Sequence, residues 1–135
     1  MSNLKLIHGS CADQTTDVVV NAVITSACKM KNTKYIIHAV GPDFRQTPKA
    51  FLELFNAYYN SLVLLKDNNL HTISFPLISS GIFAGNLPNP AEESAKQCSR
   101  AYKKFIQDFP DYDIDVLLCA FTSTEYNATK TVFDK

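Results

Sequence analysis

Apolar residues in this chain fall into short unbroken runs separated by longer stretches with helical spacing. Three consecutive valines, Val18 to Val20, are typical of a strand that is buried on both faces. The strands predicted in this way are 4–8, 17–22, 35–40, 72–78 and 114–121. Because helical segments separate the later runs, the pattern predicts a mainly parallel central sheet in a three-layer α/β/α fold.

Three segments have the pattern of helices. From Phe51 onward, apolar residues recur at spacings of three and four, which places them on one helix face. A second helix is predicted to run to about residue 108, with Asn89 as its capping residue and Glu92 three positions later. Thr122 and Glu125 have the same spacing at the start of a third helix, which is expected to reach the C-terminus.

One connection is unusually short. Only the twelve residues Val23 to Lys34 separate two predicted parallel strands, and they have no convincing helical period. A parallel crossover of this kind usually carries a helix. We therefore expect one covering helix to be missing, which would leave an apolar face of the sheet uncovered.

Composition limits the classes of protein that remain. With 135 residues, 46% apolar and 19% charged, the chain fits a single domain, residues 1–135, with a substantial core. Its formal net charge is zero, so no overall field favours nucleic acid or an anionic membrane as a partner. No apolar stretch is long enough to span a bilayer, and the first residues lack an apolar signal run, so a cytoplasmic location is expected.

The four cysteines form no C-x-x-C pair, and no histidine stands at a zinc-binding spacing from them. We expect free thiols and no metal site, with Cys98 and Cys119 as small core residues. Neither a Ser-His-Asp order nor paired carboxylates on one loop can be recognised, so the catalytic residues are unknown.

The most informative segment is 75–85, where a buried strand is followed by a Ser-Ser-Gly turn and then a helix. In open α/β sheets, ligands bind at the carboxyl ends of strands. A turn of small residues can point several backbone N–H groups at phosphate oxygens. Spacing alone also allows an ordinary strand-to-helix loop. Phe121, at the end of another strand, could stack on a purine, although a core position is commoner for an aromatic residue.

Several motifs, in order along most of the chain, resemble the macro domain family of the ADP-ribose-binding, Appr-1″-p processing type. They are Thr-Asp-Val-Val-Val-Asn-Ala from Thr16, Tyr-Ile-Ile-His-Ala-Val-Gly-Pro from Tyr35 and Phe-Pro-Leu-Ile-Ser-Ser-Gly-Ile-Phe from Phe75. The resemblance implies a ligand loop at the Ser-Ser-Gly turn for a diphosphate and its distal ribose, and an adenine pocket around Phe121. The residues implied to contact the ligand are Cys11, Asn21, Ser79, Ser80, Gly81, Ile82, Phe83, Phe121, Thr122 and Tyr126.

The chain also departs from the family pattern. An acidic residue that accepts a bond from adenine in the family is Ser10 here, which weakens the expected selectivity for adenine. After Asn21 and Ala22 the family has a second asparagine, a glycine-rich loop and a helix, whereas this chain continues with Val23 and Ile24. The short connection is thus interpreted as a deletion of part of the ligand site.

These features predict a binding module for ADP-ribose or a related adenine diphosphate nucleotide, weakened in affinity and degenerate as a catalyst. No cofactor is implied. One alternative is a protein-interaction domain that has lost its ligand, with a second copy of the chain as the candidate partner for the uncovered sheet face. The other is a hydrolase acting on ADP-ribosyl protein or O-acetyl-ADP-ribose. The sequence favours the absence of enzymatic activity, because the residues that would clamp the ribose are missing.

Overall fold

The computed structural model describes residues 2–10, 14–22, 35–39, 50–79 and 89–133. Its strands are β1 (Asn3–His8), β2 (Val18–Ala22), β3 (Tyr35–Ala39), β4 (Thr72–Pro76) and β5 (Asp115–Ala120). Its helices are α1 (Phe51–Asp67), α2 (Pro90–Asp108) and α3 (Ser123–Phe133). All strand pairs are parallel, in the order β1-β5-β4-β2-β3, which confirms the predicted parallel α/β sheet.

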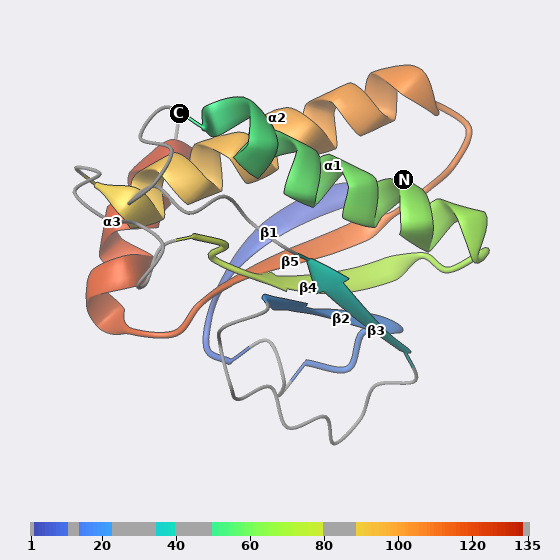
Figure 1. Cartoon of the computed structure of the whole chain (residues 1–135). Coiled ribbons are helices and arrows are strands. Elements are labelled where there is room, and N and C mark those ends of the chain that lie inside the picture. The colour runs from blue at the N-terminus through green and yellow to red at the C-terminus, as the bar shows by residue number, and fades with distance from the viewer. Residues whose placement is uncertain (1, 11–13, 23–34, 40–49, 80–88, 134–135) are drawn as a thin grey trace.

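The two long helices lie side by side on one face of this sheet (Figure 1). The chain passes from β3 through α1 to β4, and then through α2 to β5, stepping in the same direction along the strand order. Right-handed crossovers in one direction place their helices on the same face. The second helical layer of the predicted sandwich, and the expected deletion at Val23 to Lys34, concern residues outside the described ranges.

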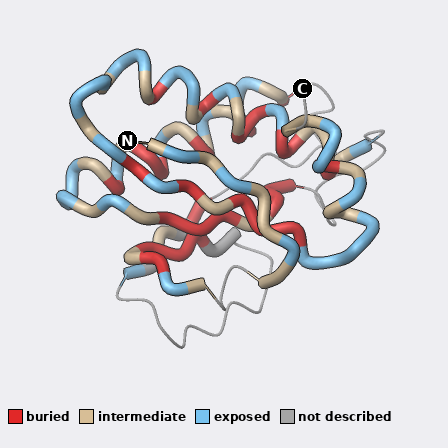
Figure 2. The backbone as a smooth tube through the Cα atoms, turned by 180° about the vertical axis from the view of Figure 1, so that it is seen from behind, coloured by how far each residue is buried: buried red, intermediate tan, exposed pale blue. Residues whose placement is uncertain are grey.

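One large apolar cluster occupies the space between the sheet and the helices. Its bulkiest fully buried side chains include Tyr58, Phe75 and Phe105. Part of α3 packs against the same cluster through Tyr126 and Val132. Figure 2 shows the buried residues following the strands and the inward sides of the helices, while the outer turns of the helices are exposed.

The opposite face of the sheet is not open at its centre. Val19 is 0% exposed and Cys119 is 4% exposed, and both pack with Ile7 and Leu117. The expectation of an uncovered apolar face is therefore wrong at these positions. Cys98, on the helix-covered face, is also a buried free thiol, as predicted, and burial raises its pKa well above the usual range.

The two predicted capping arrangements have different outcomes. Asn89 precedes α2 in a left-handed conformation, with φ 53°, and its side chain makes no capping hydrogen bond. A capping side chain reaches the first amides of a helix from the extended region, so this prediction is wrong. At α3, Glu125 N donates to Thr122 Oγ1 and Thr122 N donates to Glu125 Oε1, both over 3.1 Å, which confirms the capping box.

We expect Thr122→Ala to lower the free energy of unfolding by about 1 kcal/mol, because it removes the acceptor for an amide at the start of α3. Urea unfolding measures the change. Thr131→Ala is the matched control, since Thr131 lies in the same helix and only donates to the Ala128 carbonyl. Equal losses in the two variants would show that the capping box contributes nothing.

Candidate functional site

The carboxyl ends of three neighbouring strands form one edge of the sheet. Because β5 lies between β1 and β4, the ends of these strands meet: His8 pairs with Ala120, and Pro76 pairs with Cys119. Gly9 N donates to Ala120 O over 2.9 Å, so the segments leaving β1 and β5 stay together. This is the edge at which α/β sheets bind ligands.

The segment after β4 is held by two buried hydroxyl groups. Ile78 N donates to Tyr58 Oη over 3.0 Å, and Ser94 Oγ donates to Ile78 O over 2.7 Å. Tyr58 Oη and Ser94 Oγ are themselves 2.6 Å apart. Tyr58 comes from α1 and Ser94 from α2, so both helices secure the segment where it leaves the sheet.

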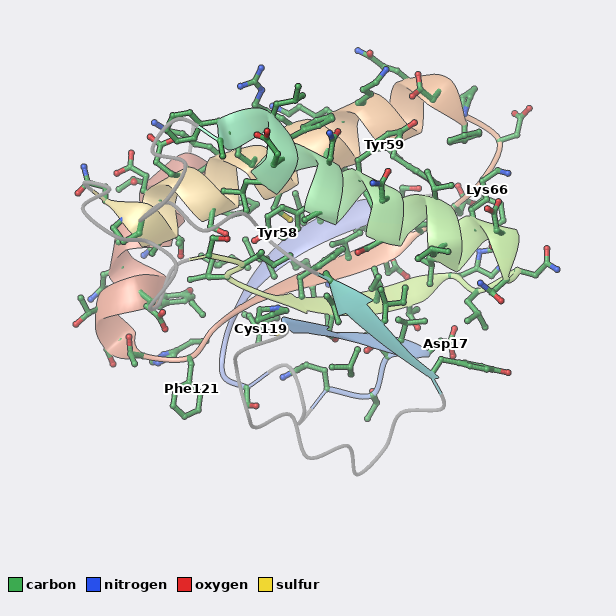
Figure 3. All side chains as sticks on the ribbon, viewed as in Figure 1. Asp17, Tyr58, Tyr59, Lys66, Cys119 and Phe121 are labelled. Carbon is green, nitrogen blue, oxygen red and sulfur yellow. The ribbon has the colours of Figure 1, made fainter. Side chains whose placement is uncertain are left out.

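The Tyr58 hydroxyl is neutral under ordinary conditions. It lies between α1 and the sheet (Figure 3), and its ring meets Phe75 edge-on with 5.0 Å between the ring centroids. Desolvation by this burial is the main cause that raises its pKa far above the usual range for tyrosine. The hydroxyl therefore keeps its proton and can act as donor and acceptor together.

Ser79, which follows directly, has a left-handed backbone. Its φ is 60°, and its side chain is buried. This conformation costs a residue other than glycine roughly 1–2 kcal/mol. The end of β4 thus leads into a strained turn at the place where the sequence predicts the ligand loop, and such strain accumulates at functional sites.

Phe121, after β5, has an environment unlike that of a core aromatic residue. Its side chain is 71% exposed and extends away from the sheet at the end opposite Asp17 (Figure 3). The core role is therefore wrong, and an exposed aromatic face remains available. Its neighbour Thr122 caps α3, and Tyr126 in the first turn of that helix stacks on His8, with ring centroids 5.1 Å apart.

The structure thus brings Ser79, Phe121, Thr122 and Tyr126 to the ends of two adjacent strands and the start of α3. Asn21 lies in β2 opposite His38, and its side chain is outside what the structure describes. The other predicted site residues lie outside the described ranges. They are Cys11, Ser80, Gly81, Ile82 and Phe83.

Sequence reasoning missed three residues of this region. The apolar spacing from Phe51 onward predicts a helix face but not that the Tyr58 hydroxyl on it forms hydrogen bonds, and Ser94 has no recognisable sequence signal. His8 has no sequence signal either, because Tyr126, on which it stacks, lies far away in sequence. Within the described ranges, no group of three histidine, cysteine or acidic residues is placed to hold a metal ion. None of the helices there is both long and apolar enough to cross a membrane.

Residues 7–98, more than half of the chain, match the family model described as Macro domain. The chain belongs to this family. The matched range includes the end of β1, all of β2, β3 and β4, the Tyr58 and Ser94 pair, and the turn at Ser79.

Relatives of this Macro domain include two named ADP-ribose glycohydrolases. It is 33% identical over 138 residues to MACROD1 of Mus musculus, covering 89% of this chain and 42% of the relative. It is 34% identical over 99 residues to MACROD2 of Xenopus laevis, covering 72% of this chain and 23% of the relative. The chain therefore spans less than half the length of either relative.

Solved structures support the same fold. The macrodomain of Oceanobacillus iheyensis with ADP is 25% identical and superposes with a TM-score of 0.76, covering 96% of this chain and 88% of that one. The Trypanosoma brucei macrodomain in complex with ADP-ribose superposes with a TM-score of 0.70 at 17% identity, covering 96% of this chain and 68% of that one. The second likeness concerns the fold alone.

We expect the free energy of unfolding of Ser79→Val to be about 1–3 kcal/mol lower than that of Ser79→Gly, because a β-branched residue is strongly disfavoured at positive φ. Both variants remove the serine hydroxyl, so its contacts cancel in the comparison. Urea unfolding of the two proteins measures the difference. Equal stabilities would mean that the left-handed turn is not kept in solution.

Proposed function

We propose that this Macro domain binds ADP-ribose, or a related nucleotide with adenine and a diphosphate, at the carboxyl ends of β1, β4 and β5. The observation that carries the proposal is that the exposed Phe121, after the end of β5, lies beside β4, which leads into the left-handed turn at Ser79. An aromatic face suits a base, and a turn of small residues suits a diphosphate. The ligands and activities in the names of the relatives and of the Oceanobacillus structure point to the same ligand class.

In this proposal the ligand lies along the strand ends. The residues from Ser79 to Phe83 surround the diphosphate and distal ribose, while Phe121, Thr122, Tyr126 and Cys11 line the adenine side, and Asn21 faces the distal ribose. We also propose that binding is weaker than in the family, since Ser10 carries no charge and the family's glycine-rich segment is absent after Ala22.

Removal of ADP-ribose from a modified protein is a second candidate function. It is favoured by the names of two relatives at 33% and 34% identity. The missing ribose clamp argues for binding without turnover. Incubation with a mono-ADP-ribosylated protein distinguishes the two, because release of free ADP-ribose above a buffer control would establish the hydrolase.

Titration calorimetry with ADP-ribose tests the binding proposal. We expect saturable heat with the unmodified chain, and a Kd raised about 5- to 150-fold by Phe121→Ala, because stacking of a base on an aromatic ring contributes about 1–3 kcal/mol. Tyr35→Ala is the matched control. Tyr35 is also an exposed aromatic residue, 54% against 71%, but it stands at the start of β3, so its loss is expected to leave the Kd unchanged.

Absence of heat at millimolar ADP-ribose would overturn the proposal. A Tyr35→Ala variant weakened as much as Phe121→Ala would show that the base does not bind at the end of β5. ADP and AMP as further ligands show how much the distal ribose and the second phosphate contribute.

A further inference from the structure

We propose that Tyr58 and Ser94 are positioning residues of this site, because their hydroxyls lock the Ile78 peptide groups that precede the left-handed turn at Ser79. The proposal rests on the proposed function, since its consequence is measured as affinity for ADP-ribose. Neither residue is assigned any contact with the ligand.

The donors and acceptors form a closed ring. Ser94 Oγ has one proton, which it gives to Ile78 O over 2.7 Å, so its contact with Tyr58 Oη over 2.6 Å must have the tyrosine as donor. Tyr58 Oη then accepts from Ile78 N over 3.0 Å. A competing contact from Tyr58 Oη to Pro76 O is longer, at 3.3 Å. Each hydroxyl therefore donates once and accepts once.

The ring restricts rotation of the backbone where the loop begins. Ile78 is 1% exposed, and both of its backbone polar groups are used within the ring. The peptide planes on either side of Ile78 cannot turn without breaking a buried hydrogen bond. Ser79 starts from one of these planes, so the ring sets the direction in which the chain enters the left-handed turn at Ser79, whose φ is 60°.

The location of the two hydroxyls indicates that they position the turn after β4 and do not simply stabilise the core. Tyr58 and Ser94 are both 0% exposed and stand on different helices, yet they converge on one residue at the carboxyl end of β4. If either hydroxyl is removed, the turn can relax to other conformations. Part of the binding free energy is then spent on restoring the turn when the ligand binds.

The test is a cycle of Tyr58→Phe, Ser94→Ala and the double variant, with the ADP-ribose Kd measured by calorimetry on the folded proteins. We expect each single variant to raise the Kd about fivefold, which corresponds to the loss of one ordinary hydrogen bond. Because either change opens the same ring, the double variant is expected to bind about as weakly as the single ones.

Tyr112→Phe is the matched control. The Tyr112 hydroxyl donates to Leu70 O over 2.6 Å in the segments that precede β4 and β5, away from the site. We expect it to lower the free energy of unfolding without changing the Kd. Amide hydrogen exchange adds a local readout, because exchange at Ile78 is expected to become faster in Tyr58→Phe and Ser94→Ala but to stay the same in Tyr112→Phe.

The outcomes separate this inference from the function on which it rests. If the unmodified chain binds ADP-ribose and both ring variants bind with the same Kd, the positioning role is wrong and the binding function stands. If Tyr112→Phe raises the Kd as much as the ring variants do, the effect comes from general stability, and the positioning role is wrong. If the unmodified chain does not bind, both proposals fall. Should Tyr58→Phe not fold, the smaller change Ser94→Ala decides the question.

Discussion

The backbone N–H and C=O groups of a buried turn need hydrogen-bond partners. In this Macro domain the groups that need them are those of Ile78. The strand before it is buried, and Ile78 itself is 1% exposed, so an unpaired N–H or C=O there would cost about 1–3 kcal/mol. No neighbouring strand supplies the partners in the described structure. Hydroxyls of Tyr58 and Ser94 supply them, and the geometry of the candidate ligand edge depends on this pairing.

The parallel order of the sheet gives this local constraint its functional place. The end of β4 lies beside the end of β5, so the turn at Ser79 and the exposed ring of Phe121 belong to one edge. The right-handed crossovers place α1 and α2 on the same face, which is why one side chain from each helix can reach the backbone of the same residue, Ile78. The strand order and the crossovers therefore determine both the fold and the position of the candidate site.

The two predicted helix starts show where a local sequence pattern is enough to predict a helix cap and where it is not. Thr122 and Glu125 form the capping box because their partners lie within one turn of the same helix. Asn89 has an equally suitable sequence, but it stands at the end of a connection and adopts a left-handed conformation. Glu92 lies near Lys96, 3.7 Å from Oε1 to Nζ, instead of reaching back to the cap. A local motif predicts a side-chain cap only where its first residue adopts the extended backbone that the cap requires.

The sequence by itself determined the parallel α/β sheet, the helix stripes and the family, and it indicated the candidate edge for a ligand, because periodicity, buried valine runs and short motifs report burial and local geometry. Tertiary structure alone decided that Phe121 is exposed and that Tyr58 is a hydrogen-bonding partner as well as a core residue. Tyr58 and Ile78 are twenty residues apart in sequence. Their contact depends on how a helix is placed over a strand, and no local pattern encodes that placement.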